Sequence, residues 1–343
     1  MPHYNLALMG FGNVGRALAQ LLLDKRGELA SKYDLSFALT AIATGRHGVV
    51  INPNGIDIEK ALRVENLASL NDPAAPPVEV TPGDGCDFIC KCNADVLFEN
   101  TPVNYQTGQP AVDCIRTALE CGMYAITANK GPVVHAYQEL TELAESKGRK
   151  FYFESAVMDG APVFGIFRET LPAANLLSFK GVLNSTTNVI LTRMEDGESF
   201  DQAVAYTQSL GLAETDPSGD IDGWDAAVKV AAMATVLMGK PLKPDQVVRE
   251  GIRGLTPEKI EKARQAGKRW KLMCSARLDG EDLLAQVEPQ MVGSETPFYS
   301  IEGSTSIVQF ETDTLHELSI IEGNPGPDTT AYGLLADFVN AVV

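Results

Sequence analysis

The sequence has few cationic residues, few cysteines and no long apolar run. Lysine and arginine number 28 against 45 aspartate and glutamate residues, so the net charge is −17 at pH 7. An acidic protein is repelled by nucleic acid and by anionic membrane surfaces, and we expect neither as a partner. The apolar runs are broken well before the ~20 residues that a membrane helix needs. The N-terminus shows no basic segment followed by a cleavage site, and we therefore expect a cytoplasmic protein.

The cysteines and aspartates do not form the usual metal patterns. Six cysteines in 343 residues are too few for a disulfide scaffold. Three of them cluster as CDFICKC (86–92), but this spacing is not that of a zinc site and no histidine follows. The four aspartates within residues 216–225 lack the D-x-D-x-D-G order of a calcium loop. We expect ordinary thiols and no calcium site.

The first half of the chain alternates strand-like and helical patterns. We expect strands at residues 4–9, 35–44, 94–101, 123–129 and 150–157, and helices at 13–23, 111–122 and 133–148. Strands that alternate with helices predict a parallel, doubly wound α/β sheet. We assign residues 1–150 to a Rossmann-type dinucleotide-binding domain.

After residue 157 the pattern changes. A strand, a turn and a helix are expected over 176–197, helices over 200–210 and 224–238, and short strands joined by Gly and Ser turns over 288–323. This order predicts a second domain of α+β type over 151–328. The last helix, 329–343, is expected to rejoin the first domain.

The stretch GFGNVG (10–15) follows the first strand and opens a helix. Gly10 permits the tight turn, Gly12 lets backbone approach a pyrophosphate, and Gly15 lets helix and strand pack closely. The free N–H groups at the start of the helix favour phosphate oxygens. The pattern therefore predicts dinucleotide binding, to which we also assign four further residues: Asn13, Val14, Thr101 and Gly323.

The segment after the second strand reads Thr44-Gly45-Arg46-His47 and contains no acid that could hold a ribose 2′-hydroxyl. An arginine at this place suits a 2′-phosphate, so Arg46 favours NADP(H) as cofactor. The alternative is a solvent-exposed arginine without a ligand, and NAD(H) then remains open.

Three further stretches combine polar groups with apolar flanks. ITANKGPV (126–133) places Lys130 just past the fourth strand, at the sheet edge where ligands of open α/β sheets bind. GVLNSTTNVIL (181–191) can cap the helix that follows, bind a polar substrate, or do both. GLAETDPSGDIDGWDAAVK (211–229) ends with Asp225 and Lys229, which lie four residues apart on one helix face. A surface lysine and a structural ion pair are the alternatives for these charged groups.

Together with the terminal TTAYGLLADF, these motifs resemble homoserine dehydrogenase, in that family's order and over nearly the whole chain. The most specific part is E-x-D-P…D-x-x-G-x-D-x-x-x-K, which is long and unusual. The family interconverts L-aspartate 4-semialdehyde and L-homoserine with NAD(P)H, on the route to threonine, methionine and isoleucine. The resemblance implies a Rossmann domain plus a substrate and dimerisation domain, in a homodimer.

The resemblance also implies catalytic residues. Asp225 and Lys229 match the family's catalytic Asp and Lys, and Lys130 matches its active-site lysine. Hydride transfer to an aldehyde generates an alkoxide, which a positioned ammonium group stabilises and helps to protonate. How Lys130 and Lys229 divide this proton transfer stays open.

For the substrate, Glu214 and Asp220 match acids that bind its amino group, and Thr186 matches its threonine contact. Asn184 belongs to the same polar run and is assigned to substrate binding. Ser185 departs from the usual glycine, so the backbone contacts expected there are less well defined.

The stretch ESAVMDGAP (154–162) resembles a loop whose backbone carbonyls hold a monovalent cation, Na⁺ or K⁺. Its Met158-Asp159 departs from the commoner small residues. The expected carbonyl ligands are those of Glu154, Val157, Asp159 and Ala161.

The segment 323–343 looks like the closing segment of the family, so we expect a short form without a C-terminal ACT domain. Threonine would then inhibit only weakly, by competition with homoserine. Two other functions stay open: another Rossmann-type reductase of a small amino-acid-derived substrate, and a dinucleotide-sensing regulator without turnover. Aspartate-semialdehyde dehydrogenase is disfavoured because it needs a nucleophilic cysteine and no cysteine lies in the polar motifs.

Overall fold

The computed structural model describes residues 1–70, 78–81 and 83–343. The chain divides into two compact units, Met1–Pro162 with Gly326–Val343, and Val163–Pro325. In these described ranges, no helix combines the length and apolar character that a membrane span requires.

The first unit contains a six-stranded sheet in the order β3-β2-β1-β4-β5-β6. Its strands are β1 (His3–Met9), β2 (Ser36–Ala43), β3 (Val49–Ile51), β4 (Val96–Glu99), β5 (Tyr124–Thr127) and β6 (Phe151–Tyr152). All neighbours are parallel except β3, which pairs antiparallel with β2. The predicted doubly wound sheet is thereby confirmed.

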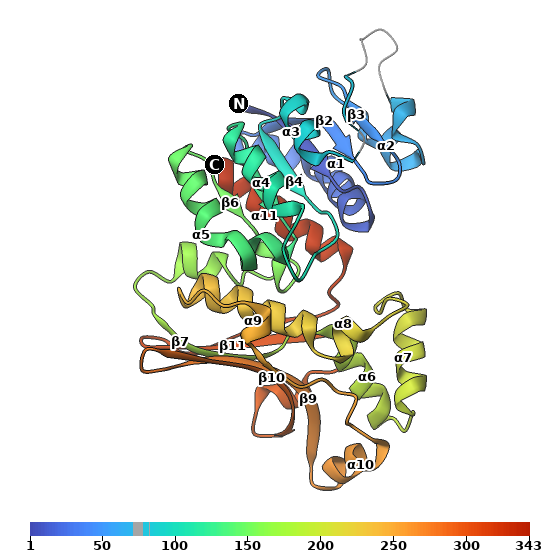
Figure 1. Cartoon of the computed structure of the whole chain (residues 1–343), viewed down its shortest axis with the longest axis vertical. Helices are drawn as coiled ribbons and strands as arrows, with labels where there is room; N and C mark the ends of the chain where they lie inside the picture. The colour runs from blue at the N-terminus through green and yellow to red at the C-terminus, as the bar shows by residue number, and fades with distance from the viewer. Residues whose placement is uncertain (71–77, 82) are drawn as a thin grey trace. The chain divides into compact units, whose positions relative to one another are not determined.

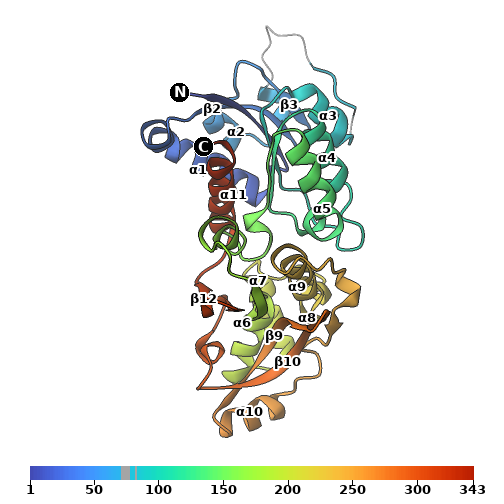
Figure 2. The same cartoon turned by 90° about the vertical axis from the view of Figure 1, so that its left-hand side faces the viewer.

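Helices cover both faces of this sheet (Figure 2). One face is covered by α1 (Asn13–Tyr33) and α11 (Pro327–Val342), and the other by α3 (Gly85–Cys92), α4 (Ala111–Glu120) and α5 (Lys130–Ser146). Leu6 and Leu8 of β1 pack in the core beside α1 and α11, whereas Ala7 and Met9 pack beside α3 and α4. Burial on both faces explains why residues 6–9, the buried part of β1, are all apolar. The short α2 (Ile58–Arg63) and the 3₁₀ turn Leu67–Leu70 follow β3.

The strand expected over 150–157 is wrong beyond Tyr152, and the chain turns there into a 3₁₀ segment, Glu154–Ala156. Glu154 N donates to the carboxylate of Asp337 on α11 (2.7 Å), and Ser155 Oγ donates to Thr330 O (2.8 Å). The backbone therefore bonds to a helix instead of a neighbouring strand.

The second unit contains a six-stranded sheet in the order β12-β11-β7-β9-β10-β8. Its strands are β7 (Leu176–Val182), β8 (Val248–Arg249), β9 (Lys268–Asp279), β10 (Asp282–Gly293), β11 (Ser306–Thr312) and β12 (His316–Glu322). Only the β8–β10 pair is parallel among the described strands of this sheet. The α+β character predicted for this half is confirmed.

The helices of the second unit include α9, which lies along β9 and β10 (Figure 1). Their bounds are α6 (Ser185–Glu195), α7 (Phe200–Ser209), α8 (Ser218–Ile221), α9 (Trp224–Leu237) and α10 (Pro257–Gln265). Shorter helical segments occur at Ile166–Thr170, Pro244–Gln246 and Pro297–Ser300. α9 is buried on nearly every side, as its small and apolar residues predict.

Candidate active site

Asn184 joins the start of α6 to two acids of the α8–α9 segment. Its side-chain oxygen accepts a hydrogen bond from Thr187 N (2.8 Å) and so caps α6. Its amide nitrogen donates to Asp220 Oδ1 (2.6 Å) and to Asp225 Oδ2 (3.0 Å). The polar run therefore caps a helix, which is one of the roles that the sequence left open, and it also contacts the acidic motif. Its contact with substrate stays a prediction.

Asp225 and Lys229 form a buried ion pair on α9. Lys229 Nζ lies 3.4 Å from Asp225 Oδ2, and the two side chains are only 15% and 12% exposed. The same ammonium group donates to Leu183 O, at the end of β7, over 2.6 Å. A carboxylate and a carbonyl thus hold the one cation of an otherwise apolar helix.

The turn before α9 separates the roles of the neighbouring aspartates. Gly223 begins the helix with a left-handed φ of 78°, which favours glycine. The side chain of Arg253 pairs with the carboxylate of Asp222, and Arg249 donates to its carbonyl. Asp222 therefore fixes the turn, while Asp220 belongs to the Asn184 cluster.

The cluster carries excess negative charge. Burial, and next the charge of Asp225, raise the pKa of Asp220, while hydrogen bonds from Asn184 and Thr186 and the charge of Lys229 act in the opposite direction. By formal charge, two carboxylates and one ammonium group sum to −1. A cationic group on a bound ligand would offset this charge.

The structure brings most of the predicted substrate residues together. Thr186 donates to Leu212 O (3.0 Å) and lies within hydrogen-bonding reach of Asp220. Glu214 lies instead on the loop between α7 and α8 with its side chain exposed, and its carbonyl accepts from Gln208 Nε2 (3.1 Å). Glu214 is thus outside the hydrogen-bonded cluster.

The thiol nearest the cluster is not a nucleophile. Cys274 of β9 is fully buried, and burial raises its pKa to about 12. A protonated, inaccessible thiol cannot attack a carbonyl, which agrees with the absence of cysteine from the polar motifs.

The glycine turn of the first unit has the geometry of a phosphate site. A Cβ on Gly10, whose φ is 97°, would lie 2.4 Å from Asn100 O, and a Cβ on Gly15 would lie 2.3 Å from Gly10 O. A Cβ on Gly12 would meet nothing within 4 Å. Gly12 begins α1 as its N-cap without a side-chain hydrogen bond. The tight contacts at Gly10 and Gly15 and the open space at Gly12 fit a pyrophosphate bound at the helix start.

Asn13 and Val14 are the first residues of α1, so their N–H groups belong to the same helix start. Arg46 lies in the exposed loop after β2, where Thr44 Oγ1 accepts a hydrogen bond from His47 N (2.8 Å). This places the arginine at the carboxyl end of β2, the position expected for contact with the adenosine ribose.

Lys130 and Thr101 lie at the carboxyl ends of neighbouring strands. Lys130 is the first residue of α5, after β5, and Asn129 caps this helix by accepting from Gly131 N (2.9 Å). Thr101 follows β4 and bonds to Glu99, a buried acid that our sequence reasoning missed. The signal was present, because Glu99 is a charged residue inside an apolar strand.

The expected cation loop is held in the first unit. Asp159 has a left-handed φ of 38° and accepts from Thr329 Oγ1 (3.2 Å), and Ala161 N donates to Met158 O (2.7 Å). Glu154 and Val157 are buried.

Gly323 follows β12 in the second unit and is exposed, so its cofactor role stays a prediction.

The family model described as homoserine dehydrogenase matches residues 162–339, and that of the homoserine dehydrogenase NAD-binding domain matches residues 10–154. The chain belongs to the homoserine dehydrogenase family. An NAD(+)-dependent homoserine dehydrogenase of Pseudomonas canavaninivorans is 34% identical over 341 residues, 99% of this chain and 96% of the relative.

Solved structures agree with the homoserine dehydrogenase assignment. A putative homoserine dehydrogenase from Archaeoglobus fulgidus superposes with a TM-score of 0.85 at 29% identity, over 98% of each chain. A hyperthermophilic archaeal homoserine dehydrogenase in complex with NADPH gives 0.83 at 27% identity, over 99% of this chain and 98% of the other. Homoserine dehydrogenases are oxidoreductases that reduce aspartate semialdehyde to homoserine with NAD(P)H, and the alternative functions are not favoured.

Proposed function

We propose that the reduction of L-aspartate 4-semialdehyde is carried out here by Lys229, Asp225 and Lys130. The proposal rests on the buried Asp225–Lys229 pair. Burying an ammonium group on an apolar helix costs free energy, and buried charged groups are concentrated at functional sites. The protein would serve cytoplasmic synthesis of threonine, methionine and isoleucine. A direct test follows NADPH oxidation by the purified protein with aspartate semialdehyde. If there is no turnover, the proposal is wrong and the alternative of a dinucleotide-sensing protein is favoured.

In this proposal Lys229 acts on the oxygen that becomes an alkoxide. Bound NAD(P)H supplies the hydride. Among the described residues, Lys229 Nζ donates to Leu183 O and pairs with Asp225, so one of its three N–H bonds would be directed to the substrate oxygen. Asp225 fixes the position of the ammonium group, so that Lys229 stabilises the alkoxide and delivers a proton. Lys130, at the start of α5, is the second proposed ammonium group.

The acidic cluster fits the amino group of the substrate. Asp220 would pair with the ammonium group that homoserine and aspartate semialdehyde both carry, which offsets the net negative charge of the cluster. Asn184 and Thr186 hold Asp220 in place. Glu214 would join from its loop, and this assignment rests on the family resemblance.

We further propose NADP(H) as the preferred cofactor, with NAD(H) also accepted. The glycine turn fits the pyrophosphate of either cofactor, so the choice depends on the 2′ position. Arg46 and the lack of an acid from Thr44 to Gly48 favour the phosphate. The similar proteins divide, since one is named NAD(+)-dependent and another was solved with NADPH.

Arg46→Glu is expected to raise the KM for NADPH by ~10²-fold or more and that for NADH only slightly. The change removes the partner of a 2′-phosphate and adds repulsion, whereas a 2′-hydroxyl carries no charge. Steady-state kinetics with both cofactors measure the ratio. The matched control is Arg264→Glu on α10, which makes the same charge change at an exposed arginine. Equal changes in the two KM values would remove Arg46 from the 2′ site.

A monovalent cation is proposed for the loop 154–161. Backbone carbonyls of Glu154, Val157, Asp159 and Ala161 are the donors that Na⁺ or K⁺ prefers. Among the described residues, no three His, Cys, Asp or Glu side chains gather as a transition-metal or calcium site would require. The hydrogen bonds to Thr329 and Thr330 hold this loop in shape.

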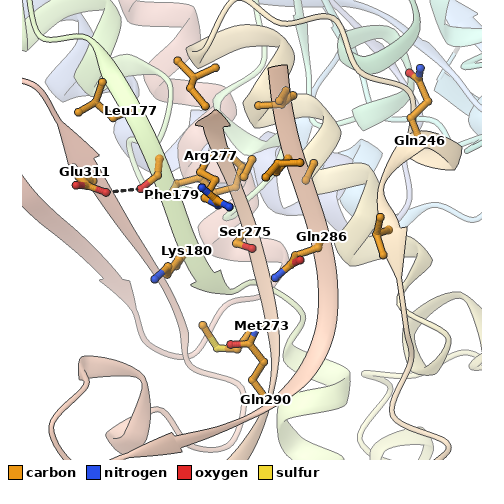
Figure 3. A pocket seen from close by; sticks show the side chains of 17 residues that line it. Leu177, Phe179, Lys180, Gln246, Met273, Ser275, Arg277, Gln286, Gln290 and Glu311 are labelled. Atoms are coloured by element: carbon orange, nitrogen blue, oxygen red, sulfur yellow. Dashed lines mark hydrogen bonds between the residues drawn. The ribbon is translucent and has the colours of Figure 1, made fainter. Parts of the chain in front are cut away.

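We propose a homodimer formed by the open face of the second sheet. Cys274 is fully buried and lies close enough to α9 for the charges of Lys229 and Asp225 to affect its pKa, so by alternation Ser275 and Arg277 point to the opposite face. Figure 3 shows this face, a hollow of about 750 Å³ lined by β7, β9, β10 and Glu311 of β11. Val248 is 70% exposed and Leu284 is 44% exposed at its border. A second copy would cover these apolar groups and match Arg277 to acids across a two-fold axis.

Leu284→Arg is expected to weaken the dimer by ~10²-fold or more, because a buried, unpaired charge beside Arg277 costs several kcal/mol. Light scattering after size exclusion at micromolar concentration would show half the wild-type mass. Leu210→Arg, at an exposed site that ends α7, is the matched control. An unchanged mass for both variants would place any dimer interface elsewhere.

A further inference from the structure

Glu99 is a fully buried acid at the carboxyl end of β4, and the mechanism above does not use it. Its Oε1 accepts from Thr101 N over 2.8 Å and from the Thr101 hydroxyl, and its Oε2 lies 2.8 Å from Thr127 Oγ1. Burial raises the pKa of Glu99, while the hydrogen bonds from Thr101, Thr127 and Asn129 oppose that effect. The hydrogen bonds satisfy both oxygens of this buried carboxyl group, as is usual for buried polar groups in folded proteins.

The same hydrogen bonds continue into the turn that carries Lys130. Thr127 Oγ1 accepts from Asn129 N (2.9 Å), and Asn129 Nδ2 donates to Thr101 O (3.2 Å). Asn129 Oδ1 in turn accepts from Gly131 N (2.9 Å), which fixes the start of α5. Through Thr101 and Asn129, Glu99 thus connects the ends of β4 and β5.

The glycine turn is held by different contacts. Asn100, between Glu99 and Thr101, donates its N–H to Met9 O (2.7 Å), and its carbonyl leaves no room for a Cβ on Gly10. These are backbone contacts that do not involve the Glu99 side chain, so a change of that side chain should affect the turn that is placed to bind the pyrophosphate less than it affects Thr101 and Asn129.

We propose that Glu99 is a positioning residue that holds Thr101 and the Asn129–Lys130 turn in the arrangement needed for hydride and proton transfer. This inference rests on the roles proposed above for Thr101 and Lys130. Glu99 touches neither substrate nor cofactor in this proposal and acts only through these neighbours. Misplacement of a catalytic group by ~1 Å can cost ~10² in rate, so a positioning defect appears in kcat.

The test compares Glu99→Ala, Glu99→Gln and the control Thr40→Val. Thr40 is equally buried in the same sheet and its hydroxyl donates to Leu6 O, away from the strand ends. Glu99→Gln keeps one acceptor for Thr101 and offers an amide to Thr127 Oγ1, whose own proton can turn to Glu99 O (2.9 Å). We expect kcat to fall ~10²-fold in Glu99→Ala and to stay within about threefold of wild type in Glu99→Gln.

NADPH fluorescence titration and thermal melting are measured beside kcat and KM for each variant. The proposal requires that Glu99→Ala lose kcat while its Kd for NADPH changes less than tenfold, and that Thr40→Val keep kcat at a similarly reduced Tm. A lower Tm in Glu99→Ala with unchanged kcat would mean that Glu99 contributes to stability only.

If Glu99→Ala does not fold, Thr127→Val is the deciding variant, because it breaks the same link to Asn129 and must also lower kcat. Lys130→Ala separates the two proposals. Full activity in Lys130→Ala would overturn the proposed catalytic role of Lys130. A normal kcat in Glu99→Ala would overturn only the positioning role of Glu99.

Discussion

Lys229→Ala is expected to lower kcat by ~10²–10⁴-fold while the protein stays folded and still binds NAD(P)H. The variant removes the ammonium group that would stabilise the developing alkoxide and protonate it. Its loss removes one donor from Leu183 O and one partner from Asp225, which keeps the hydrogen bond from Asn184. The helix keeps its apolar packing, and alanine favours a helix. Single-turnover kinetics with NADPH separate the chemical step from product release.

Asp225 provides a second measurement on the same pair. Asp225→Asn keeps the size of the side chain but removes the charge that holds Lys229, and we expect a kcat loss of ~10² or more. Lys240→Ala is the control, because Lys240 is half-buried beyond the end of α9 and donates only to a carbonyl, Glu281 O, among the bonds of the described residues. Near-normal turnover in both Lys229→Ala and Asp225→Asn would reduce the pair to a structural ion pair.

The parts of the fold that could be predicted from the sequence are those with local causes. The spacing of apolar residues predicts the alternation of β1, α1 and β2. The turn between β1 and α1 is specified by the three glycines of GFGNVG, each of which meets a different steric requirement. The helix α9 was also predictable, because Asp225 and Lys229 interrupt an apolar helical pattern at i and i+4. The family resemblance then supplied the reaction, which neither spacing nor composition contains.

The contacts that complete the candidate site come from distant segments. Asn184 meets Asp220 and Asp225 across 36 and 41 residues, and the carbonyl that holds Lys229 belongs to Leu183 and has no side-chain signal. The long strand β9 was missed because KRWKLMCSARLD mixes charged and apolar residues, and Lys271 within it is nonetheless fully buried. Tertiary pairing with β7 and β10 decides that strand, not local preference.

The premature end of β6 has the same kind of cause. The sequence after Phe151 predicts that the strand continues. The N–H of Glu154 instead donates to Asp337, near the C-terminal end of the chain, so the strand ends there. The segment CDFICKC has a local cause instead, because it lies in α3, whose Asp84 cap accepts from Asp87 N (3.0 Å).

Gly12→Asp is expected to abolish useful cofactor binding without loss of stability. A Cβ at Gly12 meets open space, and the residue is the N-cap of α1 in an extended conformation that any residue adopts. Aspartate is a good N-cap, since its carboxylate accepts the first N–H groups of the helix. Those N–H groups are the ones that a pyrophosphate requires. The new carboxylate therefore satisfies the helix and repels the cofactor.

The size of this effect follows from the charges. Two unit charges 4 Å apart at an effective dielectric constant near 20 repel by about 4 kcal/mol, so the Kd for NADPH and for NADH should each rise by ~10²-fold or more. Thermal melting without cofactor should give a Tm equal to that of wild type or higher. Gly12→Ala, which adds the Cβ without the charge, is the control and should bind both cofactors far more tightly than Gly12→Asp does. Gly10→Ala should instead destabilise the fold, because its Cβ would clash with Asn100 O at 2.4 Å. Tight NADPH binding by a folded Gly12→Asp protein would mean that the pyrophosphate does not bind at the start of α1.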